Sequence, residues 1–334
     1  MNISVLGAGS WGIALTVLLA HNGHKVSVWS IDENEIKMLK EHREHVTKLP
    51  GIKIDESVTF TTDAKESVKD AGIIVMAVPS PFVRNTAKTI APYVNQPVIV
   101  NVSKGIEEDT LMVLTDVILS EIPNAKMGVL SGPSHAEEVG KLLPTTIVAG
   151  AADKDTALLI QDTFMCDVFR VYTSPDVIGI ELGGALKNVI ALAAGVADGL
   201  GCGDNAKAAI ITRGISEITR LGVAMGGRSE TFAGLSGIGD LIVTCASTHS
   251  RNRRAGVLMG QGKSYKEAME EVQMVVEGVY SAKAAFCLSK KYGIEMPLIE
   301  MVNRVLFEDL DTTEAMKQLL TRTRTSESHE LEWN

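Results

Sequence analysis

Short runs of apolar and β-branched residues alternate with stretches of helical periodicity over the first half of the chain. Residues 2–6 form such a run, and the segment 10–22 that follows has helical spacing and stops at Gly23. Further buried strands are predicted at 25–29, 72–77, 97–102, 127–130 and 145–149, with a helix over about 82–93. Strands that alternate with helices predict an α/β fold with a doubly wound, parallel Rossmann-type sheet.

The pattern changes near residues 172–178. Beyond them strand signals nearly vanish, and segments rich in Ala, Leu, Ile and Glu recur at helical spacing. Helices are predicted over roughly 176–199, 204–225, 251–260, 264–272, 278–291 and 297–306. We therefore expect a sheet domain over 1–175, an all-helical C-terminal domain over 176–322, and a polar tail over 323–334.

Composition fits a soluble protein with two domains. The chain has 334 residues, more than one hydrophobic core usually supports, with 45% apolar and 22% charged side chains. Its net charge of −9 argues against binding to nucleic acid or to anionic membranes. The apolar stretch 3–20 resembles a signal peptide, but no Lys or Arg precedes Lys25 and three glycines interrupt it. We therefore expect neither a targeting segment nor membrane insertion.

The cysteines are widely spaced and form no CxxC pair; they are Cys166, Cys202, Cys245 and Cys287. This spacing indicates neither a zinc site nor a disulfide framework, and reduced thiols are typical of a cytoplasmic protein. No cluster of metal ligands is evident along the chain, so we expect no metal.

A glycine-rich loop directly follows the first predicted strand and opens the first helix. In GAGSWG, Gly7 permits a tight turn, Gly9 lets the backbone approach a pyrophosphate, and Gly12 lets the helix pack on the sheet. The backbone amides of Ser10 and Trp11 then point at the phosphates, where the positive end of the helix favours an anion. An ordinary glycine-rich turn is the alternative interpretation, but the strand–turn–helix context favours a dinucleotide site.

The end of the second strand, residues 30–33, normally contacts the adenosine ribose. An acidic side chain here, Asp32 or Glu33, accepts hydrogen bonds from the ribose hydroxyls of NAD, whereas Arg accommodates the 2′-phosphate of NADP. No Lys or Arg occurs before Lys37. The same two acidic residues equally fit the exposed start of the next helix, so the choice between NAD and NADP stays open.

Two further segments follow predicted strands. Lys104, in VSKGIE, lies at a carboxyl strand end where a side chain can contact a bound ligand, although a solvated surface lysine is the alternative. In SGPSHAEE, Gly132 shapes a turn, and Ser134 and His135 can donate hydrogen bonds. His135 titrates near neutrality and suggests a general base, but a structural or capping role fits it equally.

Lys187 lies in a nearly uncharged stretch, IELGGALKNVIALAAG, one turn after Gly183 and Gly184, which permit close backbone approach. A lysine there either extends its amine to solvent or lines a cleft. In a cleft, burial and a second cation such as Lys104 would lower its pKa towards neutrality and suit it to proton transfer.

A second glycine-rich region covers residues 234–256. Asp240 lies in a predicted tight turn that can direct its carboxylate into a site. Ser250, Arg251 and Asn252 then open a helix, and such an N-terminus readily binds a phosphate. A plain N-cap with solvated arginines is the alternative.

Six segments occur in one order along the chain: GAGSWG, VSKGIE, LSGPSHAEE, GGALKN, GLSGIGDLIVTC and SRNRRAG. In order and spacing they resemble bacterial NAD(P)-dependent glycerol-3-phosphate dehydrogenases, from residue 2 to about 320. The resemblance implies reduction of dihydroxyacetone phosphate to sn-glycerol 3-phosphate, the precursor of glycerophospholipids, with NADH or NADPH. Many relatives carry a basic residue near positions 30–32 and this chain has none, so we expect comparable use of the two cofactors or a preference for NADH.

The resemblance also implies roles for individual residues. Lys187 is implied as the catalytic acid/base at the C2 oxygen of the substrate, and His135 is not the base in this pattern. The implied substrate contacts are Lys104, Gly132, Ser134, Lys187, Asp240, Ser250, Arg251 and Asn252. Beyond the glycine loop and Asp32, the implied cofactor contacts are Lys104, Ala136, Arg251, Val275 and Glu277.

Three other functions are alternatives to glycerol-3-phosphate dehydrogenase activity. One is another two-domain hydride-transfer enzyme acting on a β-hydroxyacid or 6-phosphogluconate, and another is a nucleotide-sensing module without catalysis. A scaffold protein is the third, but it leaves both glycine-rich regions unexplained. Two-fold pairs are the commonest soluble assembly, so a homodimer through the helical half is expected.

Overall fold

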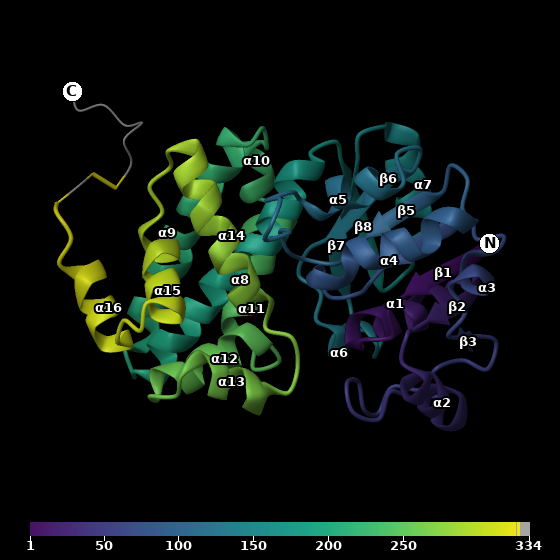
Figure 1. Ribbon diagram of the computed structural model, residues 1–334, viewed down its shortest axis with the longest axis horizontal. Helices are drawn as coiled ribbons and strands as arrows, with labels where there is room; N and C mark the ends of the chain where they lie inside the picture. Colours follow the sequence, from purple (N-terminus) through teal and green to yellow (C-terminus); the bar gives the residue numbers. More distant parts are fainter. Residues whose placement is uncertain (325, 328–334) are drawn as a thin grey trace.

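The computed structural model describes residues 1–324 and 326–327 (Figure 1). Its sheet part and its helical part lie side by side along the long axis of the molecule, with the N-terminus in the sheet part. The sheet contains β1 (Asn2–Leu6), β2 (Lys25–Trp29), β3 (Thr59–Thr61), β4 (Ile73–Met76), β5 (Val98–Asn101), β6 (Lys126–Ser131), β7 (Thr145–Ala151) and β8 (Phe169–Ser174).

Helices cover both faces of this sheet. They are α1 (Ser10–His21), α2 (Glu33–His42), α3 (Ala64–Val68), α4 (Val83–Ile90), α5 (Leu114–Glu121), α6 (Ala136–Val139) and α7 (Lys154–Phe164), with short 3₁₀ helices η1 (Ser80–Phe82) and η2 (Ala91–Tyr93) on either side of α4. Separate apolar clusters pack on the two faces, one around Leu15 of α1 and the other around Val83 of α4.

The strand order is β3-β2-β1-β4-β5-β6-β7-β8. The order reverses between β1 and β4, the position at which doubly wound sheets bind dinucleotides. The carboxyl ends of β1, β4, β5 and β6 meet at this edge because these strands are parallel. The sheet therefore gathers the loops that begin at Gly7, Ala77, Val102 and Gly132 in one place.

Two features of the sheet differ from the sequence-based expectation. The sheet is not wholly parallel, because β6 and β7 pair antiparallel and β8 then runs parallel to β7. The strands β3 and β8 are additional, and both lie at edges of the sheet. Their sequences, TFT and FRVYTS, alternate polar and apolar side chains because one side of each faces solvent, so neither shows a continuous apolar run.

The helical part is built around α8 (Val177–Gly199), which begins just after the last strand ends at Ser174. Around it pack α9 (Gly203–Ala224), α10 (Ser229–Phe232), α11 (Asp240–Ala246), α12 (Arg251–Gly260), α13 (Tyr265–Val272), α14 (Glu277–Tyr292), α15 (Pro297–Phe307) and α16 (Thr312–Leu320). The six helices predicted beyond residue 175 are confirmed within about one residue at each end. Of the predicted tail, residues 325 and 328–334 lie outside the described residues.

Helix α8 is the core of this part. Among the described helices it alone has the length and apolar composition of a membrane span, and 83% of its most apolar window is buried inside the protein. Such burial is what the central helix of a folded domain requires. A membrane is therefore not needed to account for its apolar sequence.

Glycines bring α8 and α12 into backbone contact. A Cβ atom on Gly195 would lie 2.1 Å from the carbonyl oxygen of Arg253, and one on Gly256 would lie 2.1 Å from that of Leu192. Gly199 and Gly260, one turn further along each helix, repeat this arrangement. The close contact fixes the N-terminus of α12 relative to the middle of α8.

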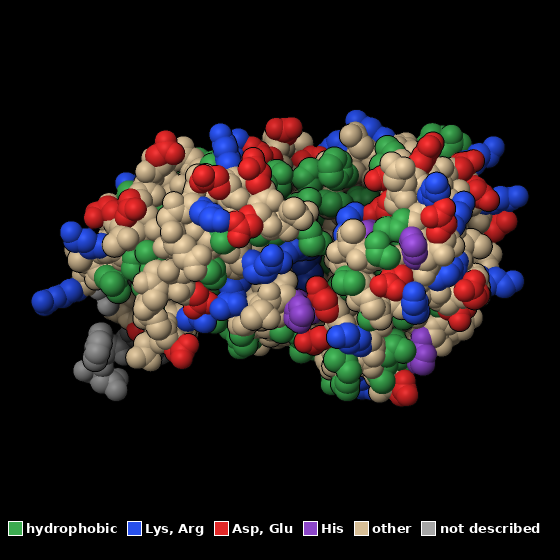
Figure 2. All heavy atoms as spheres, turned by 90° about the horizontal axis from the view of Figure 1, so that it is seen from below, with side chains coloured by type: hydrophobic (Ala, Val, Ile, Leu, Met, Phe, Trp, Pro, Cys, Tyr) green, Lys and Arg blue, Asp and Glu red, His purple; other side chains and the backbone are tan. Residues whose placement is uncertain are grey.

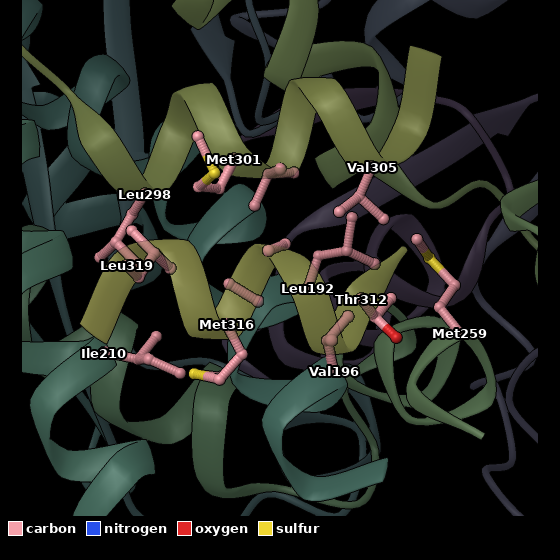
Figure 3. A pocket seen from close by; sticks show the side chains of 13 residues that line it. Leu192, Val196, Ile210, Met259, Leu298, Met301, Val305, Thr312, Met316 and Leu319 are labelled. Atoms are coloured by element: carbon pink, nitrogen blue, oxygen red, sulfur yellow. The ribbon is translucent and has the colours of Figure 1, made fainter. Parts of the chain in front are cut away.

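An apolar cavity of about 40 Å³ lies between α8, α15 and α16. Figure 3 shows Leu192 and Val196 facing Met301, Val305 and Met316 across it. A space of this size holds at most a water or two, and Thr312 is the one polar side chain among the residues that line it. We interpret it as a packing gap under the C-terminal helix.

Candidate active site

The glycine loop after β1 forms a cradle that side chains would fill. Gly7 has a φ of +115°, and a Cβ on it would lie 2.8 Å from the carbonyl of Ala77; a Cβ on Gly12 would lie 2.0 Å from the oxygen of Gly7. A Cβ on Gly9, by contrast, would meet nothing within 4 Å. Gly7 and Gly12 are therefore required by packing, while Gly9 leaves open space for a ligand, which fits a pyrophosphate over this loop.

The start of α1 presents free donors to that space. Gly9 is its N-cap and has no side chain to cap the helix, and none of the described residues accepts from the backbone N–H of Ser10 or Trp11. The indole Nε1 of Trp11 is also buried without a hydrogen-bond partner among the described residues. These N–H groups and the positive helix end suit an anion.

At the end of β2 the carboxylate of Asp32 caps α2, accepting from the N–H of Asn34 at 2.9 Å and of Glu35 at 3.3 Å. The start-of-helix interpretation of Asp32 is therefore confirmed, and Asp32 remains exposed after the end of β2. Its carboxylate keeps a second oxygen for a ligand.

Sequence reasoning missed a charged cluster behind this position. Glu35 accepts hydrogen bonds from Ser30 Oγ at 2.5 Å, from Lys48 Nζ at 2.5 Å and from His45 Nε2 at 2.9 Å. Burial acts to raise the pKa of Glu35, but these three hydrogen bonds outweigh it and lower the pKa to about 2. Folding thus brings Lys48 to the opposite oxygen of Glu35 from Ser30.

Two lysines meet over one carboxylate at the junction of the two parts. Lys104, from the loop after β5, donates to Asp240 Oδ2 at 2.6 Å, and Lys187, from α8, donates to Oδ1. Asp240 is only 1% exposed, and the Lys187 side chain is 7% exposed. Lys187 therefore does not extend to solvent, and its amine lies in an interior site with one net positive charge.

Local sequence explains why these groups meet. Gly183 lies against the carbonyl of Ser236 with no room for a Cβ, and a Cβ on Gly184 would lie 3.0 Å from Ser131 Oγ, next to the aliphatic part of Lys104. Asp240 was expected in a tight turn, but the preceding residues form a π-helical segment, η3 (Leu235–Gly239), and Asp240 is the first residue of α11. Such segments are frequent at functional sites because they redirect a helix.

Thr244 completes the cluster and was not identified from the sequence. Its hydroxyl accepts from Lys187 Nζ at 2.7 Å and donates to the backbone oxygen of Asp240 at 2.6 Å. The spacing of four residues between Asp240 and Thr244 on one helix is the signal that could have found it.

The electrostatics favour proton transfer by Lys187. Burial lowers the pKa of Lys187 to about 7; attraction to Asp240 opposes this change, and repulsion from Lys104 adds to it. Burial acts to raise the pKa of Asp240, but the two lysines outweigh it and hold the carboxyl ionised. Burial and then repulsion from Lys187 lower the pKa of His135, which makes a 3.5 Å contact with the oxygen of Val243.

The start of α12 provides a second anion position. Ser250 is its N-cap and accepts from the N–H of Arg253 at 3.2 Å, as the capping interpretation predicted. The side chain of Arg251 is half-buried, and burial lowers its pKa; attraction to Glu277 and Glu137 opposes this, and no hydrogen bond contributes. Among the described residues nothing accepts a hydrogen bond from its guanidinium, so this group suits an anion, and its partial burial differs from the solvated arginines that were the alternative.

Other predicted residues line the same junction. The oxygen of Gly132 accepts from Lys104 Nζ at 3.5 Å and from Ser134 Oγ at 2.9 Å. Glu277, the first residue of α14, accepts from the N–H and the hydroxyl of Ser80, and Asn252 donates to Asn188 at 2.9 Å. Ala136 begins α6, and Val275 lies just before α14. Figure 2 shows a hollow between the two parts with Lys and Arg side chains on its helical side.

The cysteines are unpaired, as their spacing predicted. Folding does bring one mixed group together away from the lysine pair: ligand atoms of His21, Cys166 and Asp167 lie within 4.8 Å of one another. Spacing along the chain did not indicate this group. His21 and Asp167 are exposed, and we assign it no function.

A glycine-cradled sheet edge, next to a buried cluster in which the sheet part supplies Lys104 and the helical part supplies Asp240 and Lys187, fits the class of two-domain nicotinamide dehydrogenases. Sequence profiles narrow the class: the N-terminus of NAD-dependent glycerol-3-phosphate dehydrogenase matches residues 2–157, and its C-terminus matches residues 176–317. This chain belongs to the NAD-dependent glycerol-3-phosphate dehydrogenase family.

Individual relatives agree with the profiles. The chain is 62% identical to glycerol-3-phosphate dehydrogenase [NAD(P)+] of Agathobacter rectalis, over 99% of both chains. It is 57% identical to the same-named protein of Fusobacterium nucleatum, over 96% of this chain and 97% of the relative. The crystal structure of glycerol-3-phosphate dehydrogenase from Coxiella burnetii superposes with a TM-score of 0.93 at 37% identity, covering 96% of this chain and 99% of that one.

Proposed function

We propose that this chain reduces dihydroxyacetone phosphate to sn-glycerol 3-phosphate with NADH or NADPH in the cytoplasm, and that the product supplies glycerophospholipid synthesis. The observation that carries the proposal is the buried Lys104–Asp240–Lys187 cluster together with the N-terminus of α12, whose Asn252 donates to Asn188, the residue after Lys187. The lysine cluster suits a ketone and its proton donor, and the N-terminus of α12 suits a phosphate.

Lys187 is the catalytic acid in this proposal. Its ammonium group donates a proton to the C2 oxygen of the substrate, and in the reverse reaction the neutral amine takes that proton back. A pKa near 7 makes both forms of Lys187 available at neutral pH. Lys104 lies on the other side of Asp240 and stabilises negative charge that develops on the same oxygen.

Substrate recognition combines the two positions. Arg251 and the N-terminal residues Ser250 and Asn252 of α12 bind the phosphate, because a free guanidinium and a helix N-terminus both favour a dianion. Gly132, Ser134 and Asp240 hold the three-carbon chain next to the lysines.

The dinucleotide binds along the sheet edge. Gly7, Gly9, Gly12, Ser10 and Trp11 bind the pyrophosphate, and Asp32 binds the adenosine ribose. The remaining contacts come from the junction of the two parts: Lys104, Ala136, Arg251, Val275 and Glu277. When bound, the reduced nicotinamide supplies the hydride that the C2 carbon accepts. The reaction as proposed uses no metal ion.

The proposal is tested by the rates of the purified protein with different substrates. NADH oxidation with dihydroxyacetone phosphate should be far faster than NAD(P)+ reduction with 6-phosphogluconate or a β-hydroxyacid. Faster reaction with either acid would replace the assignment with that activity. NADH binding without any turnover would instead indicate a nucleotide sensor. Sedimentation at several protein concentrations tests the proposed homodimer.

A further inference from the structure

A carboxylate on α8 lies buried, and no Lys, Arg or His of residues 1–324 and 326–327 pairs with it. Glu181 is 6% exposed, and Asn101, the last residue of β5, donates to its Oε1 at 3.0 Å. Thr115 donates to it twice, from its backbone N–H at 3.0 Å and from its hydroxyl. Burial raises the pKa of Glu181 to about 7 in spite of these bonds, so the ionised group is costly to keep here.

The hydrogen bonds of Glu181 lead directly to the active-site loop. Asn101 holds the peptide of Ser103 on both sides: its Nδ2 donates to the Ser103 oxygen at 3.2 Å, and its Oδ1 accepts from the Ser103 N–H at 3.1 Å. The hydroxyl of Ser103 donates in turn to the oxygen of Val78 at 2.5 Å. The next residue in the chain is Lys104.

Glu181 also closes the start of α5. This helix begins at Leu114, and its N-cap, Val113, has no side chain that can accept a hydrogen bond. The N–H of Thr115 belongs to the first turn, whose donors have no partner within the helix. The helical part of the molecule thus supplies the capping group for a helix of the sheet part.

One helix therefore controls both lysines. Lys187 projects from α8 directly, six residues and about 9 Å of helix rise beyond Glu181. Lys104 is held from the same helix through Glu181, Asn101 and Ser103. The two ammonium groups meet on opposite oxygens of Asp240.

We propose that Glu181 is a positioning residue, which ties the Lys104 loop to α8 and thereby sets the separation of Lys104 and Lys187 around Asp240. Its role in turnover rests on the proposed function, because the readout is reduction of dihydroxyacetone phosphate. A merely structural carboxylate would stabilise the fold without acting through Lys104.

The chain contains a matched control. Glu217, on α9, is equally buried, caps α15 by accepting from the N–H of Leu298 at 2.9 Å and of Ile299 at 3.3 Å, and has its pKa raised to about 7 by burial. None of its partners lies in the Lys104 loop. Glu181→Gln and Glu217→Gln thus remove the same kind of group from similar surroundings. Only Glu181 is connected by hydrogen bonds to the Lys104 loop.

Glu181→Gln should lower kcat for dihydroxyacetone phosphate about 10-fold or more, because a shift of about 1 Å at a catalytic group costs on the order of 100-fold. Glu217→Gln should change kcat less than about 2-fold for a comparable loss of thermal stability. Backbone hydrogen exchange should accelerate in residues 98–105 of Glu181→Gln only. Equal kinetic losses in the two variants, or unchanged kcat in a folded Glu181→Gln, would overturn the proposal.

A double-mutant cycle tests the route. Once Lys104→Ala has removed the lysine, adding Glu181→Gln should lower kcat little further, whereas independent effects would multiply. If Glu181→Gln does not fold, Asn101→Ala breaks the connection between Glu181 and Ser103 while Thr115 still donates to Glu181, and it should show the same kinetic loss; full activity in this variant would refute the route. A wild-type protein that does not reduce dihydroxyacetone phosphate would defeat the proposed function instead, while multiplicative losses in an active enzyme would defeat this inference alone.

Discussion

Asp240 shares its carboxylate between Lys104 and Lys187, which donate to different oxygens of the group. A buried pair of cations repels, and the carboxylate between them offsets part of that repulsion and of the cost of burial. With both lysines protonated, the three groups carry one net positive charge, and the hydrogen bond to Asp240 fixes the orientation of the Lys187 amine.

Lys187→Ala should abolish most turnover and leave NADH binding intact. Positioned proton transfer contributes about 10²–10⁴-fold, so kcat should fall within this range while the dissociation constant of NADH changes little. Steady-state assays and a fluorescence titration with NADH measure the two quantities. Lys283→Ala, at a lysine whose side chain is 55% exposed, is the control and should behave as wild type. Normal turnover in Lys187→Ala would remove this residue from the mechanism.

The pH profiles of the two reaction directions should be opposite. Reduction requires protonated Lys187, so its kcat/KM should fall as the pH rises above about 7; oxidation of glycerol 3-phosphate requires the neutral amine and should fall below about 7. Asp240→Asn removes an attraction that raises the pKa of Lys187, so the alkaline limb of reduction should move to lower pH. A limb that stays in place in this variant would assign the titration to another group, such as the substrate phosphate.

Glu35 should set the balance between NADH and NADPH. The wild type should not prefer NADPH by more than about 10-fold in kcat/KM, which corresponds to about 1.4 kcal/mol. Glu35→Gln removes a negative charge bonded to Ser30 and leaves Lys48 unpaired, so the ratio of NADPH to NADH use should rise about 5-fold. Glu33→Gln removes an exposed neighbouring charge and should change the ratio less. An equal change of the NADPH-to-NADH ratio in the two variants would mean that any negative charge near this position has the same effect, and that Glu35 has no specific role.

Gly256→Ala should destabilise the helical part strongly. The new Cβ would lie 2.1 Å from the oxygen of Leu192 and would push α12 away from α8, at a cost of about 3 kcal/mol or more. Gly262→Ala, just beyond α12, meets nothing within 4 Å and strains only a φ of +98°, so about 1 kcal/mol is expected. Urea unfolding compares the two. Similar losses of unfolding free energy in the two variants would mean that α8 and α12 can move apart at little energetic cost.

Much of the fold could be predicted because its central strands and helices carry strong local patterns. Residues 73–76 are buried at every position, so β4 reads as one apolar run, and α8 is apolar along nearly its whole length. The edge strand β8 is different, because its alternate side chains face solvent. The reversal of β7 relative to β6 depends on how the connecting segment packs, and no residue type marks it.

The candidate site divides in the same way. The glycine loop and the segments around Lys104 and Lys187 are each an unbroken run of sequence. Their local patterns therefore predict phosphate binding and proton transfer. Lys48 and Asn101 become relevant only when folding brings them to Glu35 and Glu181. Such residues have no local pattern, because their partners are distant in sequence.

The glycine contacts between α8 and α12 have a consequence for substrate choice. The two backbones are in direct contact, so no side chain between the helices can change rotamer to let them shift. The backbone at Lys187 and the N-terminus of α12 therefore keep a fixed separation. If the carbonyl and the phosphate of a substrate must reach these two points together, the number of atoms between them is selected by rigid geometry. A homologous ketone phosphate with one more carbon would fit one end or the other, but not both.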